Sequence, residues 1–436
     1  MKTTHSLLCL LLLAPACDRG DDSGLPDEPE PLAADEVKGL RAPVAGAPVA
    51  SPSASPEQQH AKPKETKQPR PVVPEAKVAF EELAELIDSK YVDGPLSEDE
   101  LWTGAMEGVL ARLVQLPDHE INALLAPREH EELLIGTKGR LVGVGVMIER
   151  VANVVVVRDV IPGGPAERAG LMAGDRILGV DGQRLGDLEL EAVVDRIRGP
   201  EGSTVELFVQ RDIEEWTQPV TRGLVEVSSV QGRMLEGGVG YLRITSFSEK
   251  TTAELDAELE ALAEAGASSL VLDLRHCPGG LLEASLEVAS RFVPAGDLLL
   301  RVEHRKGGEP TKEHRSEGEH PWQTRPLAVL IGPKTASSAE ILADAIREHD
   351  RGLLVGEPTL GKHTVESIHE LSGGWAVKLS VGRFATASGE TEQGVGVPPD
   401  IRIPAPEQVH KAVRLEELDP ASDPQLATAL GLLRND

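Results

Sequence analysis

Two segments of the chain combine residue types that could perform nucleophilic catalysis. Residues 333–341 place Ser337 and Ser338 at the start of an expected helix, and an earlier loop contains Gly279 and Gly280. At a helix N-terminus, unpaired backbone N–H groups and the positive end of the helix dipole favour negative charge on a nearby oxygen. A serine in this position is most often only a helix cap, so the pattern alone leaves a purely structural role open.

The elements around these loops alternate between strands and helices. Buried apolar runs predict strands at residues 240–244, 269–274, 327–331 and 353–355, and amphipathic periodicity predicts helices at 252–265, 281–292 and 338–349. This alternation indicates an α/β domain at residues 225–404, in which helices pack on a sheet. Active sites in such domains lie in the loops at strand ends, where both segments fall.

Two smaller regions precede this domain. Apolar stripes at helical spacing predict a helical N-terminal segment at residues 76–138. Short β-branched runs interrupted by Pro and Gly then predict strands at 142–148, 154–157, 176–180 and 205–209, with short helices at 166–169 and 190–197. Residues 139–213 are therefore expected to form a small mixed-β domain. Residues 405–436 are assigned to a C-terminal tail segment.

The composition excludes several classes of protein. The chain has 436 residues, of which 40% are hydrophobic, so a wholly disordered or fibrous protein is excluded. A net charge of −28 repels phosphate backbones, and an aromatic content of 3% argues against base stacking, so no nucleic-acid partner is expected. Cys277 is the only cysteine beyond the N-terminal region, which leaves no disulfide framework or cysteine-based zinc site.

The N-terminus has the pattern of an exported protein. A basic start, a short apolar run and small residues predict a cleaved signal peptide at residues 1–16. Cys17 follows directly and resembles the lipidated cysteine of bacterial lipoproteins; an ordinary cleaved signal with an incidental Cys17 is the alternative. Residues 17–75 are rich in Pro, Ala, Asp and Glu and are expected to be a disordered linker. Because no later stretch is apolar enough to span a bilayer, lipid would be the only membrane anchor.

The small mixed-β domain carries a family resemblance. Four segments in order, 142–146, 164–171, 174–178 and 180–182, resemble a PDZ domain of the bacterial protease type. A Gly-containing loop before an exposed strand can bind a peptide carboxylate with its backbone N–H groups, while the strand edge pairs with the peptide. The resemblance implies that five consecutive residues bind the peptide: Val142, Gly143, Val144, Gly145 and Val146.

The whole folded body carries a second resemblance. Residues 273–282, 333–341 and 356–362, in this order after a PDZ-like domain, resemble the C-terminal processing (tail-specific) serine peptidases. The resemblance extends from residue 76 to residue 404 and includes the motif at 396–400. It implies a crotonase/ClpP-like α/β core with a Ser-Lys pair. The family places its reactive serine three residues before a glutamate, which is Glu340 here, and this spacing selects Ser337.

The same resemblance assigns the other catalytic roles. Lys362 would be the general base, 25 residues after Ser337, as the family's motif requires. The N–H groups of Gly279 and Ser338 would form the oxyanion hole, with Gly280 as the alternative to Gly279. A serine hydroxyl needs an adjacent base, and an amine can serve only when it is neutral. Since burial disfavours a charged amine, Lys362 is expected in a dry cleft beside Ser337. Acyl transfer by this pair requires no cofactor.

Glu366 departs from the family pattern. Many members have Gln four residues after the lysine, where it is thought to orient the amine. An ionised Glu366 would keep Lys362 charged and weaken it as a base, whereas a protonated Glu366 could hydrogen-bond as an amide does. We therefore group Glu366 with the catalytic residues and expect activity that is weak or shifted in pH.

Several other residues have open roles. Cys277 stands where the family usually has Asn, either as a passive small residue or as a redox-sensitive thiol. Glu348 would either support the active-site helix or be a solvated charge at its end. Arg275 is expected to anchor its loop through internal hydrogen bonds. Three histidines lie in a charged loop without the spacing of metal ligands, so no metal site is expected: His304, His314 and His320.

Together these observations predict a serine endopeptidase of the bacterial cell envelope, on the periplasmic side and lipid-anchored to a membrane. Its substrates would be polypeptides with exposed apolar C-termini, captured by the PDZ-like domain. The helical segment offers a surface for self-association, as in some relatives. The alternative, motivated by Glu366, is a catalytically weak or inactive PDZ scaffold that binds C-terminal tails without cutting them.

Overall fold

The computed structural model describes residues 74–92, 95–113, 121–151, 154–186, 188–305, 309–389, 393–405 and 415–434. The predicted signal peptide, Cys17 and the linker up to residue 73 lie outside the described residues. One compact unit ends at Leu101 and contains α1 (Pro74–Lys90), and another continues from Trp102. α2 (Glu98–Leu110) spans the boundary between them. Within the described ranges, no helix has both the length and the apolar character needed to cross a membrane.

The predicted helical N-terminal segment is confirmed, with one addition. α3 (Pro127–Thr137) follows α1 and α2, and its first turn begins with proline, whose missing N–H costs nothing at that position. The short strand β1 (Ala123–Leu125) precedes α3 and pairs antiparallel with β18 (Ala376–Ala385). Through β1, the N-terminal segment contributes an edge strand to a sheet whose other strands lie within residues 225–404.

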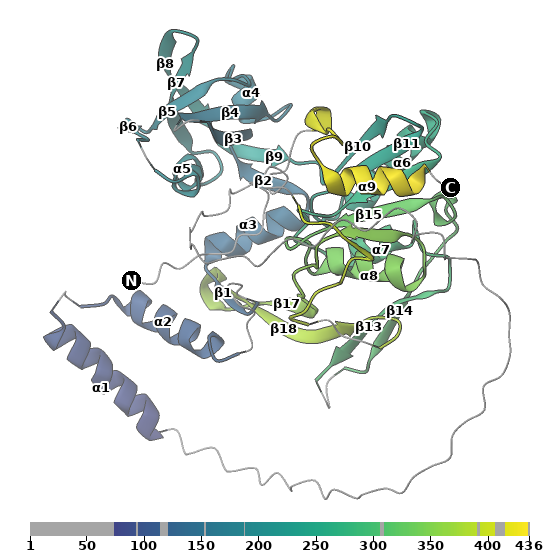
Figure 1. The fold of residues 1–436 in the computed structure, drawn as a ribbon. Coiled ribbons are helices and arrows are strands. Elements are labelled where there is room, and N and C mark those ends of the chain that lie inside the picture. The colour runs from purple at the N-terminus through teal and green to yellow at the C-terminus, as the bar shows by residue number, and fades with distance from the viewer. Residues whose placement is uncertain are drawn as a thin grey trace, which may run out of the picture. The chain divides into compact units, whose positions relative to one another are not determined.

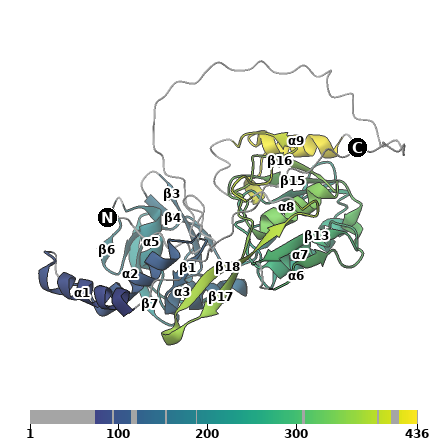
Figure 2. The ribbon, with the colours of Figure 1, turned by 90° about the horizontal axis from the view of Figure 1, so that it is seen from below.

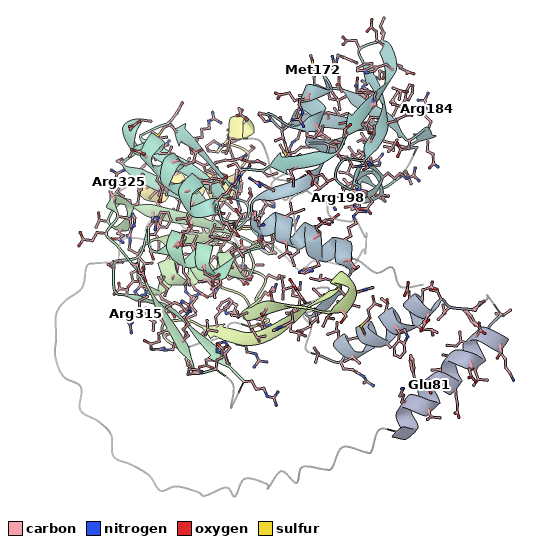
Figure 3. All side chains as sticks on the ribbon, turned by 180° about the vertical axis from the view of Figure 1, so that it is seen from behind. Glu81, Met172, Arg184, Arg198, Arg315 and Arg325 are labelled. Atoms are coloured by element: carbon pink, nitrogen blue, oxygen red, sulfur yellow. The ribbon has the colours of Figure 1, made fainter. Side chains whose placement is uncertain are left out.

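The small β domain is an antiparallel sheet with the order β3-β4-β5-β7-β8, and β6 pairs with β5. Its strands are β3 (Val146–Val151), β4 (Val154–Val160), β5 (Arg176–Val180), β6 (Gln183–Arg184), β7 (Thr204–Arg211) and β8 (Glu214–Thr221). α4 (Pro165–Arg168) and α5 (Leu190–Ile197) complete it, and α5 buries Leu190, Val193 and Ile197 in the core. On β6, Arg184 (labelled in Figure 3) lies over the ring of Phe208, 4.5 Å from its centroid. β3 is an edge strand of this sheet.

The predicted strand at 142–148 is two strands in the structure. β2 (Arg140–Gly143) pairs with β9 (Gly223–Glu226) in a separate ribbon, and β3 begins at Val146. The break falls at Gly145, whose φ of 78° lies in the left-handed region that a residue with a side chain rarely adopts. Alternating apolar residues cannot reveal such a break, because the pattern continues across it.

The α/β domain is built on a six-stranded sheet with the order β10-β11-β12-β15-β16-β19. Its strands are β10 (Val230–Leu235), β11 (Val239–Ile244), β12 (Ser269–Asp273), β15 (Leu327–Ile331), β16 (Leu353–Gly356) and β19 (Ile401–Arg402). The pairs from β11 to β19 are parallel, and β10 is antiparallel to β11. The predicted strands in this region are therefore confirmed, with β10 and β19 added at the edges.

Helices cover both faces of this sheet (Figures 1 and 2). α6 (Thr251–Glu264), α7 (Leu282–Ala289) and α8 (Ser338–Glu348) lie on one face, where alternate strand residues such as Leu272 and Val329 join their core. α9 (Pro424–Leu433) covers the other face and packs on Val271 and Leu330. The segment assigned from sequence to a tail thus contains a helix of the domain core.

A second sheet, which the sequence did not predict, has the order β1-β18-β13-β14, and β17 pairs with β18. Its other strands are β13 (Leu298–His304), β14 (Lys312–Arg315) and β17 (Thr364–Glu370). Among the described residues, three short 3₁₀ turns complete the elements: η1 (Pro321–Gln323), η2 (Ser372–Gly374) and η4 (Leu415–Glu417). β17 begins two residues after Lys362, so this sheet fixes the segment that follows the predicted base.

One ion pair in the small β domain gives a stability prediction. The Asp175 carboxylate is 1% exposed and accepts hydrogen bonds from Nε and Nη2 of Arg211 at 2.6 and 2.8 Å. Arg211→Met leaves this buried charge without its partner. We expect a loss of about 2–3 kcal/mol, less than for a fully buried pair because Arg211 is 34% exposed. Hydrogen–deuterium exchange of the β5 and β7 amides in the full chain measures the loss.

The matched control for that variant is Arg176→Met, which removes an exposed arginine from β5. Its effect should stay within about 0.5 kcal/mol. Equal protection of the β5 and β7 amides in both variants would show that the Asp175–Arg211 pair contributes nothing.

Candidate active site

Three loops meet at the edge of the sheet where the parallel strands β12, β15 and β16 end. Backbone hydrogen bonds join them: Ala336 N donates to Cys277 O at 3.0 Å, and Leu360 N donates to Thr335 O at 3.0 Å. The Thr335 hydroxyl also donates to Leu274 O at 2.8 Å. The predicted nucleophile loop, oxyanion loop and base loop therefore form one hydrogen-bonded assembly.

Ser337 stands at the N-cap of α8 in a strained conformation. Its φ is 54° and its ψ is −120°, and a non-glycine residue with positive φ is uncommon. Such strain costs on the order of 1–3 kcal/mol and persists only where the surroundings impose it, most often at functional sites. The neighbouring Ser338 hydroxyl donates to Gly280 O at 2.8 Å, which ties the start of α8 to the oxyanion loop.

Gly279 lies directly against Ser337, the predicted nucleophile. A methyl group at this position would lie 2.7 Å from Ala336 O and 2.9 Å from both Ser337 Cβ and Ser338 N, so only glycine permits the approach. Gly280 instead packs against Phe247, where an added Cβ would lie 2.1 Å from the Phe247 carbonyl oxygen. This geometry favours Gly279 over Gly280 for the oxyanion hole, and the role itself stays a prediction.

Glu340 links the two halves of the predicted catalytic pair. Its buried Oε2 accepts hydrogen bonds from Ser337 N at 2.7 Å and from Lys362 N at 2.8 Å. Oε1 accepts from Gly361 N at 2.6 Å and from the Thr359 hydroxyl at 2.5 Å. Burial raises the pKa of the Glu340 carboxyl, and these four hydrogen bonds oppose the rise. One carboxylate therefore holds the backbone of both Ser337 and Lys362.

Sequence reasoning used Glu340 only to locate the serine and missed this role. A signal was present, because Ser337 followed three residues later by Glu340 fits the capping box, in which a glutamate side chain binds the N-cap N–H. The sequence gives no sign that the same carboxylate also binds Lys362.

The Lys362 side chain is paired with Glu366. Nζ lies 2.8 Å from Glu366 Oε2, and Glu366 Oε1 accepts the Thr364 hydroxyl at 2.6 Å. The side chains of Lys362 and Glu366 are 20% and 15% exposed, so this ion pair is largely shielded from water. The side chain that departs from the family's Gln is therefore in direct contact with the predicted base.

His363, the residue after Lys362, is a buried histidine. Its ring is fully buried and stacks on Phe384, with centroids 4.4 Å apart. Burial lowers its pKa to about 4, so the imidazole is neutral at pH 7. Its Nε2 lies 3.8 Å from Glu340 Oε1. Nothing in the sequence around Lys362 singles out this histidine.

The motif at 396–400 holds the base loop in place. Val397 N donates to the Thr359 hydroxyl at 2.7 Å, and Thr359 N donates to Val397 O at 3.1 Å. Gly394 N donates to Gly361 O at 2.8 Å. This segment therefore fixes the same threonine that donates to Glu340, which explains physically why it accompanies the catalytic motifs.

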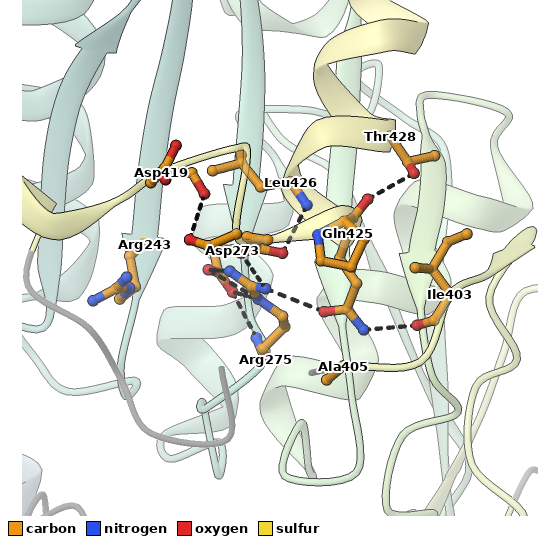
Figure 4. Close-up of polar contacts among 12 residues, drawn as sticks. Arg243, Asp273, Arg275, Ile403, Ala405, Asp419, Gln425, Leu426 and Thr428 are labelled. Carbon is orange, nitrogen blue, oxygen red and sulfur yellow. Dashed lines mark hydrogen bonds and ion pairs between the residues drawn. The ribbon is translucent and has the colours of Figure 1, made fainter. Parts of the chain in front are cut away.

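Arg275 anchors the oxyanion loop, as predicted (Figure 4). Its guanidinium binds Asp273 at 2.7 Å, Asp423 at 2.8 Å and Gln425 at 3.1 Å. The Tyr241 hydroxyl donates to Asp273 at 2.5 Å, and the guanidinium of Arg243 donates to the Tyr241 oxygen. The cationic partners hold the pKa of Asp273 well below its usual range despite burial, so this carboxylate is ionised.

The structure shows the contacts of two residues whose roles the sequence left open. The Cys277 thiol is fully buried in the hydrophobic core, where it packs as a small residue. Glu348, in the last turn of α8, accepts hydrogen bonds from the backbone and hydroxyl of Ser388, the latter at 2.6 Å. It therefore ties α8 to the turn after β18 rather than remaining a free helix-end charge.

The five predicted peptide-binding residues do not lie on one strand. Val142 and Gly143 belong to β2 and pair with β9, so that backbone already has a partner strand. The carbonyls of Val144 and Gly145 accept hydrogen bonds from Ala166 N and Ile161 N at 2.7 and 2.9 Å. Val146 begins the edge strand β3, so the loop at 144–146 is the part of the set that borders a strand edge.

Comparisons with known proteins identify the family. The model of peptidase family S41 matches residues 238–403, and that of a PDZ domain matches residues 156–211. A carboxyl-terminal-processing protease of Synechocystis sp. is 34% identical over 356 residues, which is 80% of each chain. The carboxy-terminal processing protease CtpA of Bacillus subtilis is 31% identical over 324 residues, 74% of this chain and 68% of the relative.

A solved S41 protease from Bacteroides fragilis has a similar fold. It is 16% identical, has a TM-score of 0.54, and the match covers 82% of this chain and 97% of that one. The family and the fold class predicted from the sequence are thus confirmed. The chain belongs to the carboxyl-terminal processing proteases of peptidase family S41 and is a serine-type peptidase with a PDZ domain.

Proposed function

We propose that this peptidase cleaves internal peptide bonds with Ser337 as nucleophile and Lys362 as general base. The observation that carries the proposal is the shared Glu340 carboxylate, which binds the backbone N–H of both residues. The strained backbone of Ser337 and the close approach of Gly279 support it. In this proposal, the hydrogen bonds of Glu340 hold the backbones of the nucleophile and of the base in place before substrate arrives.

The reaction follows from these positions. Ser337 Oγ forms a bond with the scissile carbonyl carbon while neutral Lys362 Nζ takes the hydroxyl proton. The N–H groups of Gly279 and Ser338 stabilise the resulting oxyanion. Collapse breaks the C–N bond, and Lys362 returns the proton to the departing amine. Water then hydrolyses the acyl-enzyme by the same route and releases Ser337.

The PDZ domain supplies the substrate. An edge strand can pair with an extended peptide, and β3 is at the edge of its sheet, next to the loop at 144–146. We infer that a polypeptide's C-terminal tail adds to β3, with its carboxylate at this loop. The enzyme would act on the periplasmic side of a bacterial cell envelope, anchored by lipid on Cys17 after removal of residues 1–16.

The catalytic pair is tested by substitution. Ser337→Ala and Lys362→Ala should each lower kcat by at least about a thousandfold, because each removes a group that bonds to or exchanges a proton with the substrate. The assay follows cleavage of an unstructured polypeptide ending in Val-Ala by the full chain in detergent. Thr428→Ala, at a half-buried position of α9 whose hydroxyl donates to Pro424 O, is the control and should retain full turnover. A wild-type kcat in Ser337→Ala would show that the proposed mechanism is wrong.

The Lys362–Glu366 ion pair gives a second test of the base. Glu366→Gln removes the carboxylate beside Nζ and keeps a side chain of nearly the same shape that can hydrogen-bond to it. We expect kcat at pH 7 to rise at least about threefold, because the amine that must accept the serine proton is no longer engaged in an ion pair. The control, Glu370→Gln, makes the same change at an exposed position of β17 and should leave kcat unchanged.

An unchanged kcat in Glu366→Gln would show that Glu366 does not control the base. Absence of turnover at every pH in the parent chain, with tail peptides still bound, would support the binding scaffold instead.

Tail recognition is tested with a pair of peptides. The full chain carrying Ser337→Ala is titrated with a fluorescent peptide that ends in a free Val-Val carboxylate, and with the same peptide as its C-terminal amide. Loss of the terminal charge should weaken binding at least about tenfold, because backbone N–H groups bind carboxylates with charge-assisted hydrogen bonds. Equal affinity for both peptides would rule out recognition of the terminus.

A further inference from the structure

The start of the C-terminal helix contacts the oxyanion loop through two side chains, Asp423 and Gln425. Asp423 is the N-cap of α9, and its Oδ1 accepts the backbone N–H of Leu426 at 3.0 Å. Its Oδ2 accepts Nη1 of Arg275 at 2.8 Å. The first turn of α9 and the base of the loop are therefore held by the two oxygens of one side chain, although 148 residues separate them in the chain.

This contact is buried and balanced in charge. The side chains of Arg275 and Asp423 are 5% and 6% exposed, and Asp273 is 2% exposed. With Arg243, the cluster contains two guanidinium groups and two carboxylates. Gln425 adds an acceptor for Arg275 and donates to Ile403 O at 2.8 Å. Removing one carboxylate would leave a buried cation partly uncompensated, which is costly enough to displace the residue that carries it.

A cavity of about 150 Å³ lies beside the contact and is lined by Arg275, by Gln425 and by parts of the two loops, among them His276 and Lys334. Next to this cavity, hydrogen bonds to Asp423 and Gln425 position the guanidinium of Arg275. Gly279, four residues after Arg275, touches Ser337 and Ser338 at the other end of the same loop.

We propose that Asp423 and Gln425 are positioning residues, which act through Arg275 to keep Gly279 at the distance from Ser337 that oxyanion binding requires. The proposal rests on the oxyanion role assigned to Gly279 above. It gives the C-terminal segment a function in catalysis: α9 sets the geometry of the oxyanion loop from the opposite face of the sheet to α8 (Figures 1 and 4).

The test is Asp423→Asn in the full chain. Asparagine is as good an N-cap as aspartate, so α9 keeps its cap while the charge that faces Arg275 is lost. The matched control is Asp419→Asn, which makes the same change four residues earlier in the chain. Asp419 is exposed, and its carboxylate accepts the backbone N–H of Ala421. Both variants and Ser337→Ala are compared with the parent chain by kcat and KM on the unstructured Val-Ala polypeptide, well below their melting temperatures.

A positioning role predicts a specific split. In Asp423→Asn, kcat should fall at least about tenfold while KM changes less than about twofold, because a misplaced donor weakens only the transition state. Asp419→Asn should change neither value more than about twofold. If Asp423→Asn does not fold, Gln425→Met removes one acceptor of Arg275 and should lower kcat about threefold to fivefold.

Two results overturn the proposal, and they are distinguishable. If Asp423→Asn keeps kcat within twofold of the parent while Ser337→Ala is inactive, the catalytic pair stands and the positioning role of Asp423 is wrong. If Ser337→Ala retains turnover, the proposed mechanism fails and this inference fails with it. A fall in melting temperature with unchanged kcat would assign Asp423 to stability alone.

Discussion

The buried carboxylate of Glu340 is the interaction on which the active site depends. A charge in a protein interior is tolerated only when hydrogen bonds replace its hydration, and Glu340 obtains four donors from two separate loops. Moving either loop would leave the carboxylate short of donors, so the position of Lys362 and the strained backbone of Ser337 depend on each other. The strain at Ser337 is sustained because relaxing it would break a hydrogen bond to a buried charge.

On both faces of the six-stranded sheet, a carboxylate at a helix N-terminus binds a neighbouring loop. α8 and α9 lie on opposite faces, and each has a carboxylate at its N-terminus that binds one of the loops: Glu340 binds the predicted base loop, and Asp423 binds Arg275 of the predicted oxyanion loop. Both carboxylates also satisfy an N–H group of their own helix. A negative group at a helix N-terminus is favoured by the helix dipole, so capping the helix and fixing the loop are compatible tasks for one side chain.

The sequence predicted elements that are buried and locally patterned, and it missed contacts made over long separations. The strands at 269–273 and 327–331 were found because all their residues are buried, and all are apolar except Ser269 and Asp273. β18 was not found, because most of its middle residues are partly exposed and follow no alternation. The candidate catalytic residues were assigned by family motif, but the link from Glu340 to Lys362 and the link from Asp423 to Arg275 exist only after folding.

Lys362 lies between β16 of one sheet and β17 of the other, so different groups hold its backbone and pair with its side chain. Its backbone is fixed by Glu340, which belongs to the parallel sheet through α8, whereas its side chain is paired with Glu366 on β17 of the antiparallel sheet. The charge beside the amine can therefore change without disturbing the nucleophile or the oxyanion loop. A substitution at residue 366 changes the charge that faces the amine, while the backbone of Lys362 is held by a different group, so charge and geometry are set separately at this position.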